Sequence, residues 1–167
     1  LRDLCDKHNV LLIFDEIVTG FRLAYGGAQE RYGVTPDICT LGKIIGGGFP
    51  LAVLGASADI MQHFDKGRVG AEKWLMQLGT LSGNPVASAA GLKSMEILRR
   101  DGAYEKLRAT GRALQEMQTD ALDNAGIAHR ICGDETLFDI FFTQSPCRDY
   151  RSAKHDDPQR NTLYNDT

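Results

Sequence analysis

Continuous apolar runs that stop abruptly at polar residues are the clearest pattern in the first part of the chain. The run from Val10 to Phe14 ends at Asp15, as is typical of a strand buried on both faces of a parallel sheet. Two further short apolar runs cover residues 37–41 and 51–56. Strands that alternate with longer loops and helices predict an α/β fold with a mostly parallel sheet and helices on both faces.

Helix signals follow further along. Asn and Pro at 84–85 are the preferred N-cap and first helical residues, so we expect a helix over 86–100 that is ended by residues 101–102. Its small residues, Gly91 among them, give it a thin face that allows close approach to a neighbour. A second helix is predicted over 103–124 from apolar residues at helical spacing. Those apolar residues are Leu107, Leu114, Met117 and Leu122.

The pattern changes again after Gly126. Residues 127–132 and 137–142 are predicted to be strands joined by a turn at Gly133-Asp134, and the polar segment 144–155 is expected to be a loop. Residues 62–73, earlier in the chain, form a looser charged stretch. We place a domain boundary near Asp101.

Composition narrows the classes of protein that fit. The 167 residues are 43% hydrophobic and 25% charged, and the net charge of -3 comes from both signs scattered along the chain. This pattern argues against nucleic-acid binding, which needs clustered Lys and Arg. No apolar stretch approaches the roughly 20 residues of a membrane span. The four cysteines form no C-x-x-C pair, so we expect reduced thiols in a cytoplasmic protein, with no metal site and no disulfides.

Asp15 is the first residue with candidate chemistry. A carboxylate at the carboxyl end of a central strand lies where α/β sheets bind ligands, and its burial requires a cationic partner. The alternative is a helix cap or a surface acid just beyond the sheet.

Lys43 is the second candidate, placed between Gly42 and an Ile-Ile-Gly-Gly-Gly sequence. Apolar neighbours that desolvate the amine would make it a nucleophile toward carbonyls, and the glycines allow backbone to approach a bulky ligand. A surface lysine in a glycine-rich turn is the alternative. A nucleotide phosphate loop is excluded, because Asp37 and Ile44 stand where that motif needs Gly and Ser or Thr.

The third candidate is the segment Gly79 to Pro85, which offers hydroxyls and backbone N–H groups just before a helix. Such an arrangement binds anions. A loop with an ordinary helix cap has the same composition.

Taken together, three blocks in this order resemble class III (ω-type, fold type I) pyridoxal-phosphate (PLP) aminotransferases. The blocks are Asp15 to Arg22, Thr40 to Lys43 with its glycine tail, and Gly79 to Pro85. Within that class the last block is most similar to the glutamate-1-semialdehyde 2,1-aminomutase branch. The resemblance implies a piece of a longer protein. Residues 1–101 would be the C-terminal part of the PLP-binding large domain, and 102–167 the beginning of an α+β small domain.

The same resemblance implies a role for each site residue. Lys43 would bind the PLP aldehyde as a Schiff base and then shuttle a proton, while Asp15 would keep the pyridine nitrogen protonated. Ile17 would pack on one face of the ring. Thr80, with the Gly79 backbone, would bind the phosphate of a neighbouring subunit's cofactor, so a homodimer is implied.

The expected function is PLP-dependent amino-group transfer on a small amino acid or an amino-aldehyde or keto substrate. A PLP racemase or decarboxylase on the same scaffold would share the cofactor residues. A non-catalytic α/β module is the alternative outside enzymes.

Overall fold

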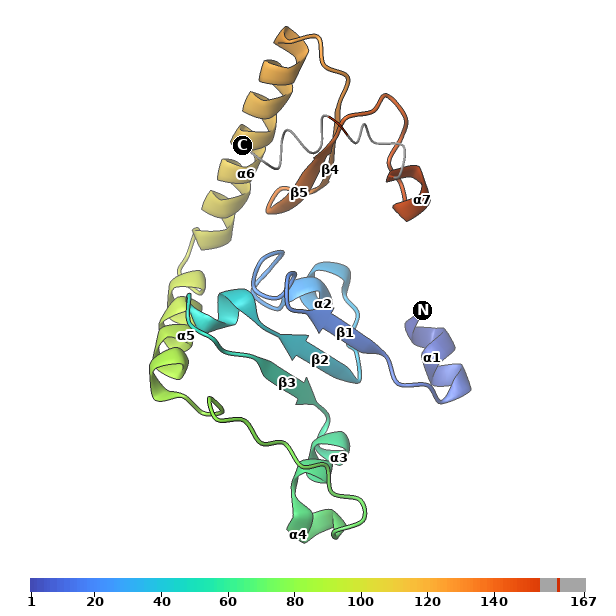
Figure 1. The fold of residues 1–167 in the computed structure, drawn as a ribbon, viewed down its shortest axis with the longest axis vertical. Coiled ribbons are helices and arrows are strands. Elements are labelled where there is room, and N and C mark those ends of the chain that lie inside the picture. The colour runs from blue at the N-terminus through green and yellow to red at the C-terminus, as the bar shows by residue number, and fades with distance from the viewer. Residues whose placement is uncertain (154–158, 160–167) are drawn as a thin grey trace. The chain divides into compact units, whose positions relative to one another are not determined.

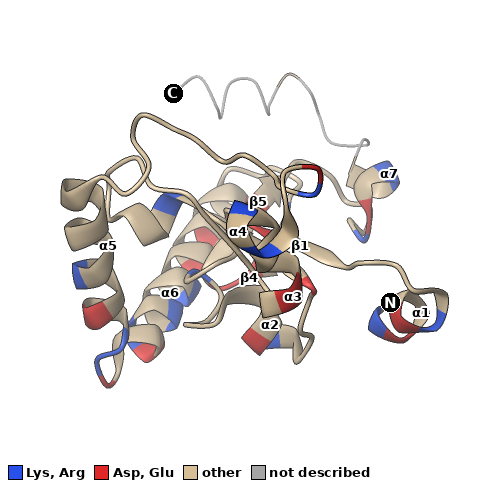
Figure 2. Cartoon of the chain, turned by 90° about the horizontal axis from the view of Figure 1, so that it is seen from below, with Lys and Arg blue, Asp and Glu red and all other residues tan. Residues whose placement is uncertain are grey.

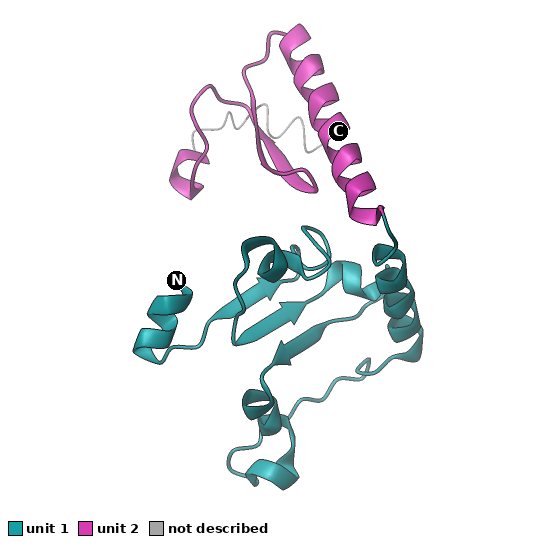
Figure 3. Ribbon diagram, turned by 180° about the vertical axis from the view of Figure 1, so that it is seen from behind, with its two compact units in different colours: residues 1–101 teal, residues 102–167 magenta. Residues whose placement is uncertain are grey.

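The computed structural model describes residues 1–153 and 159 and divides the chain into two compact units (Figure 1). The units are Leu1–Asp101 and Gly102–Thr167, drawn in separate colours in Figure 3. Each unit has its own sheet.

Unit 1 has α/β content around a three-stranded sheet of order β1-β2-β3. Its strands are β1 (Ile13–Glu16), β2 (Ile38–Leu41) and β3 (Val53–Ala56). Its helices and 3-10 turns are α1 (Arg2–His8), α2 (Gly27–Tyr32), η1 (Lys43–Gly46), α3 (Ala58–Met61), η2 (Gln62–Phe64), α4 (Lys66–Val69) and α5 (Pro85–Leu98). All three predicted strands are confirmed, each beginning slightly later than expected. Residues 62–73, predicted to be loose, instead contain the short turns η2 and α4.

The sheet is less parallel than predicted. Strands β1 and β2 run parallel, with Asp15 opposite Thr40, but β3 runs antiparallel to β2. A parallel neighbour needs a long crossover, usually a helix. The link between β1 and β2 contains α2, whereas residues 42–52 contain only the single turn η1, so the chain folds back on itself.

The expectation that β1 is buried on both faces is wrong for this chain. Ile13 is 58% exposed, and Val10 and Leu11 are exposed as well, whereas Leu12 is buried. Asp15 also lies within β1 rather than after it. The side chains alternate between the two faces, and one of these faces is left open in the chain.

Glu16 is a buried carboxylate that no feature of the sequence analysis singled out. It is 1% exposed and accepts hydrogen bonds from Thr19 Oγ1 at 2.6 Å, Ala28 N at 2.7 Å and Gln29 N at 3.0 Å. Burial alone would raise the pKa of Glu16, but these hydrogen bonds hold it below its ordinary value. A Cβ at Gly27, where φ is +68°, would overlap the same carboxylate, so glycine is required there.

A second carboxylate fixes the start of the sheet. Asp37 Oδ2 accepts the Leu12 N–H at 2.7 Å and Arg2 Nη1 at 2.8 Å. The backbone bond from Leu12 and then the Arg2 guanidinium lower the pKa of Asp37. These contacts tie α1 to the first residues of the β1–β2 pair.

Helix α5 packs closely on η1, the turn that begins with Lys43. Its start is as predicted, because Asn84 Oδ1 accepts the N–H groups of Val86 and Ala87 at 2.9 and 3.2 Å. A Cβ at Gly91 would overlap the carbonyl oxygen of Ile45. The thin helix face predicted from sequence is therefore confirmed, and it is what brings α5 against η1.

Unit 2 consists of α6 (Ala103–Asn124), the antiparallel hairpin β4 (Arg130–Asp134) and β5 (Leu137–Phe141), and the short α7 (Tyr150–Ala153). The bounds of α6 are those predicted. The side of α6 toward the hairpin is small and polar, since Gln115 Nε2 donates to the Asp134 carbonyl at 3.3 Å and Gly111 lies against Glu135. The predicted apolar positions of α6 include Leu107, Leu114 and Met117, which are exposed in this chain.

The hairpin turn was placed wrongly by the sequence analysis. Asp134 pairs with Leu137, so the turn consists of residues 135–136, and Gly133 and Asp134 belong to β4. Gly133 has φ of 134° and lies too close to Leu137 for a Cβ to fit. Glycine is required at position 133 because of this close approach and not because of the turn. The predicted loop 144–155 contains α7, and residues 154–155 lie outside the described part of the chain.

Replacing Gly91 with Ala should lower the free energy of unfolding by about 1–3 kcal/mol, because the added methyl group overpacks the α5–η1 contact. This loss should occur even though alanine favours helix by about 1 kcal/mol over glycine. Chemical denaturation would measure it, with Lys93→Ala, on the exposed side of α5, as the matched control. A Gly91→Ala protein as stable as wild type would contradict the close packing.

Replacing Glu16 with Gln should destabilise the protein by about 2–3 kcal/mol at pH 7, because an amide NH₂ would face donors that the carboxylate now accepts. Since its folded pKa is lowered, Glu16 stabilises the fold above the unfolded pKa of about 4.3, and this contribution disappears as pH falls below that value. Denaturation from pH 7 down to about pH 3 should therefore show a flatter pH dependence for Glu16→Gln. Glu72→Gln, the same substitution at an exposed residue, is the matched control.

Candidate cofactor site

Asp15 stands on β1 directly opposite Thr40 on β2, near the carboxyl ends of the two parallel strands. Its Oδ1 accepts two hydrogen bonds, from Ile17 N at 3.1 Å and from Thr40 Oγ1 at 3.2 Å. The carboxylate is exposed, in contrast to that of Glu16. As the surface-acid alternative predicts, the Asp15 carboxylate is exposed in this chain. Its position near the carboxyl end of a strand is nevertheless one where α/β sheets bind ligands.

Ile17 lies against Gly42, the residue that precedes Lys43. A Cβ at Gly42 would lie 3.3 Å from Ile17 Cγ2, so Ile17 packs against the residue that precedes the lysine. Ile17 is 39% exposed, and Lys43 is exposed as well. The block around Asp15 and the block around Lys43 therefore meet twice, through Asp15 with Thr40 and through Ile17 with Gly42.

Lys43 has an unusual backbone. Its φ is +47°, in the left-handed region where a non-glycine residue costs about 1–2 kcal/mol. It follows an extended Gly42 and begins η1, which ends at a left-handed Gly47. The surrounding packing compensates this cost, since Ile45 and Gly46 are buried and a Cβ at Gly47 would lie only 2.7 Å from the Ala90 carbonyl oxygen. Strain of this kind concentrates at functional sites.

The third predicted block lies on a separate segment. Gly79 and Ser82 form a turn through the bond from Ser82 N to the Gly79 carbonyl at 2.9 Å, and Thr80 is exposed. The hydrogen bonds and ion pairs described for residues 1–153 do not join Thr80 to Asp15 or Lys43. Among the contacts of the described residues, then, the Asp15 and Lys43 blocks meet, and none links Thr80 to Asp15 or Lys43.

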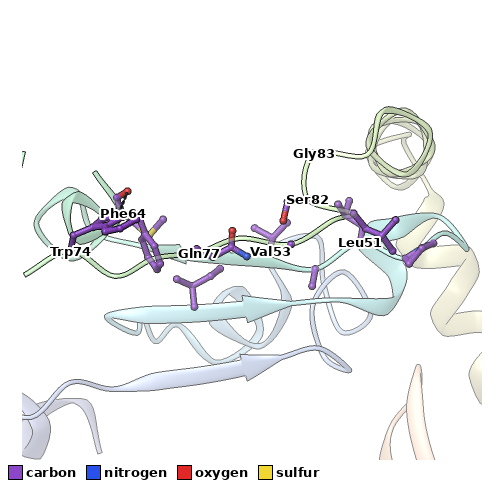
Figure 4. A pocket seen from close by; sticks show the side chains of 13 residues that line it. Leu51, Val53, Phe64, Trp74, Gln77, Ser82 and Gly83 are labelled. Atoms are coloured by element: carbon purple, nitrogen blue, oxygen red, sulfur yellow. Dashed lines mark hydrogen bonds between the residues drawn. The ribbon is translucent and has the colours of Figure 1, made fainter. Parts of the chain in front are cut away.

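Gly79 instead lines an open, mostly apolar pocket of about 860 Å³ between β3 and residues 74–83. Figure 4 shows Phe64 and Trp74 at one end of this pocket and Leu51 toward the other. The Trp74 indole N–H donates to the Phe64 carbonyl at 3.2 Å, which fixes that end. The pocket contains none of the predicted site residues except Gly79.

The contact between Thr40 and Asp15 was not predicted from the sequence. Thr40 belongs to the Thr40-Leu41-Gly42-Lys43 block, but its bond to Asp15 depends on the pairing of two strands 25 residues apart. Placing the ends of the two predicted strands, residues 14 and 41, in line would have put Gly42 opposite Asp15. Only the observed register places Thr40 there.

Other kinds of site find little support in the described residues. No group of three or more His, Cys, Asp or Glu side chains there can hold a metal ion, and the four cysteines form no disulfide in the described part of the chain. Figure 2 shows Lys and Arg interspersed with Asp and Glu, for example along α1 and α6. No helix in the described part of the chain has the length and apolar character that crossing a membrane requires.

The arrangement fits a cofactor with a basic ring nitrogen and an electrophilic carbonyl, as PLP has. Asp15 offers a fixed carboxylate with Oδ1 already engaged, Lys43 offers a primary amine, and Ile17 offers an apolar surface between the two blocks. No buried cation near Asp15 already neutralises its carboxylate among the described contacts. These are the groups that PLP chemistry requires of a protein.

Comparisons with known proteins agree with this geometry. Residues 1–154 match the family model for class-III aminotransferases. The chain is 44% identical over 164 residues to glutamate-1-semialdehyde 2,1-aminomutase 2 of Brevibacillus brevis, covering 98% of this chain and 37% of that protein. The chain thus spans a little over a third of the length of this curated relative.

Solved structures give the same result. An omega-transaminase from Sphaerobacter thermophilus is 37% identical with a TM-score of 0.82, over 95% of this chain and 35% of that one. A transaminase with PLP bound is 29% identical with a TM-score of 0.76, over 92% and 35% of the two chains. These matches confirm the predicted fold class, that of the fold type I PLP enzymes. The chain belongs to the class-III aminotransferase family.

Proposed function

We propose that the protein carrying this chain transfers amino groups with PLP, as a transaminase or as an aminomutase of the glutamate-1-semialdehyde type. The observation that carries the proposal is the meeting of the Asp15 and Lys43 blocks through the contacts Asp15–Thr40 and Ile17–Gly42. The family membership of the chain supports it. The substrate would be a small amino acid or an amino-aldehyde or keto compound, and the protein would act in the cytoplasm.

In this proposal, each residue near the carboxyl ends of β1 and β2 has a defined role. When bound, PLP supplies an electron-withdrawing ring that stabilises negative charge on the substrate carbon. Lys43 would hold PLP through its amine at the aldehyde carbon and would move a proton to and from the substrate carbon. Asp15 holds a proton on the ring nitrogen, and Ile17 packs against one face of the ring.

In this proposal, Gly79 and Thr80 bind the phosphate group of the cofactor in the neighbouring subunit. Gly79 N–H and the Thr80 hydroxyl would bind the phosphate bound at the neighbouring subunit, in a homodimer with shared sites. Two observations support this division. Thr80 is exposed, and the described contacts do not bring it to Asp15 or Lys43 of its own chain.

Replacing Lys43 with Ala should abolish the covalent link to PLP and the visible absorbance that goes with it. Activity should fall by several orders of magnitude, because the variant lacks the amine that would bind PLP and move the proton. Borohydride reduction followed by peptide mass spectrometry would locate the adduct, with Lys93→Ala as the control that keeps it. A reducible adduct retained in Lys43→Ala would contradict the assignment.

Replacing Thr80 with Val should weaken PLP binding about 10- to 100-fold, because a hydrogen bond to a charged group contributes about 1.5–3 kcal/mol. A mixing experiment tests which subunit Thr80 serves. In a mixed dimer of Lys43→Ala and Thr80→Val subunits, one site would combine an intact Lys43 with the partner's intact Thr80. Activity should therefore appear on mixing the two weak variants.

If Thr80 instead served its own subunit, every site in the mixed dimer would carry one of the two defects. Mixing would then restore nothing. Size-exclusion chromatography under the same conditions would establish that the subunits had exchanged.

A further inference from the structure

We propose that Thr40 is a positioning residue, whose hydroxyl holds the Asp15 carboxylate in the orientation that leaves Oδ2 for the ring nitrogen of the cofactor. The inference rests on the proposed function, in which Asp15 pairs with that nitrogen. It adds a residue whose side chain need not touch the cofactor.

The Asp15 carboxylate is held from one side only. Both hydrogen bonds that it accepts within the described residues go to Oδ1, from Ile17 N at 3.1 Å and from Thr40 Oγ1 at 3.2 Å. Oδ2 accepts neither of these bonds. A carboxylate anchored by two donors on one oxygen cannot rotate freely about its Cβ–Cγ bond, so its second oxygen has a fixed direction.

The two donors come from different parts of the chain. The Ile17 N–H lies only two residues further along the same chain segment. Its hydrogen bond to Asp15 therefore forms wherever β1 ends. The Thr40 hydroxyl comes from β2 and is set opposite Asp15 by the parallel register. Only the second bond ties the carboxylate to the strand that leads into Gly42 and Lys43.

The bond from Thr40 to Asp15 links the acid to the strand that leads into Lys43. The acid and the amine must act on one ring, and their separation must therefore be constant. Groups that orient a ligand-binding side chain commonly change binding or activity 10- to 100-fold when removed, in roughly the manner known for the outer shell of metal sites. Thr40 is placed to perform this task, because it is three residues before Lys43 and bonded to Asp15.

Thr40→Val tests the inference, because valine keeps the shape of threonine and removes the donor. In the full protein, this variant should retain the covalent Lys43–PLP adduct and unfold within a few degrees of wild type. Its half-reaction with an amino donor should slow by about tenfold, equivalent to the loss of one modest hydrogen bond. Nuclear magnetic resonance with PLP labelled with ¹⁵N in the ring should show less protonated nitrogen than wild type.

Two further variants separate positioning from a structural role. Thr40→Ser keeps the hydroxyl and should restore both the ¹⁵N signal and the rate. Thr110→Val, which removes an exposed hydroxyl that donates to the Lys106 carbonyl in α6, should change neither. A Thr40→Val protein with the wild-type ¹⁵N signal and rate would overturn the inference, as would a defect that Thr40→Ser does not repair.

The same experiment distinguishes this inference from the function on which it rests. A wild-type protein that forms no borohydride-reducible adduct at Lys43 would overturn both. A wild-type protein with the adduct, beside an unaltered Thr40→Val protein, would overturn the role of Thr40 alone.

Discussion

The buried carboxylate of Glu16 is the constraint on which the geometry of the sheet edge depends. Successive side chains of a strand point to opposite faces, so the inward position of Glu16 obliges Asp15 to face the other way. Thr19, Ala28 and Gln29 all donate to Glu16, which anchors the loop after β1 beneath the start of α2. Two adjacent acids thus lie in opposite environments. One is enclosed by donors and the other stays open to a ligand.

The turn that carries Lys43 is held from the opposite side by a different kind of force. Here the contact is steric, since the small residues of α5 allow its backbone to reach η1, and a larger side chain at Gly91 would prevent this. A hydrogen-bonded acid on β1 and a close-packed helix on η1 therefore act together. Between them they fix the two sides of the candidate site, in which Asp15 and Lys43 are exposed.

Sequence reasoning succeeded where the determining interactions are local. The Asn84 cap and the bounds of α6 follow from residues within a few positions of each other, and the three blocks were recognisable as linear patterns. It failed where strand pairing decides. The antiparallel direction of β3, the turn at 135–136 and the contact of Thr40 with Asp15 all depend on register between separate segments. The burial of Glu16 was missed because its partners lie as far away as Gln29.

The left-handed backbone at Lys43 has a consequence for how this position can vary. Glycine adopts such a conformation without steric cost, so a chain optimised for folding alone would have glycine at position 43. Under the proposed function, lysine at this position accepts a less stable backbone conformation in order to supply a reactive amine. In relatives without the proposed activity, this residue would be free to change to glycine or asparagine. Such a substitution would identify these relatives even where the rest of the sequence is intact.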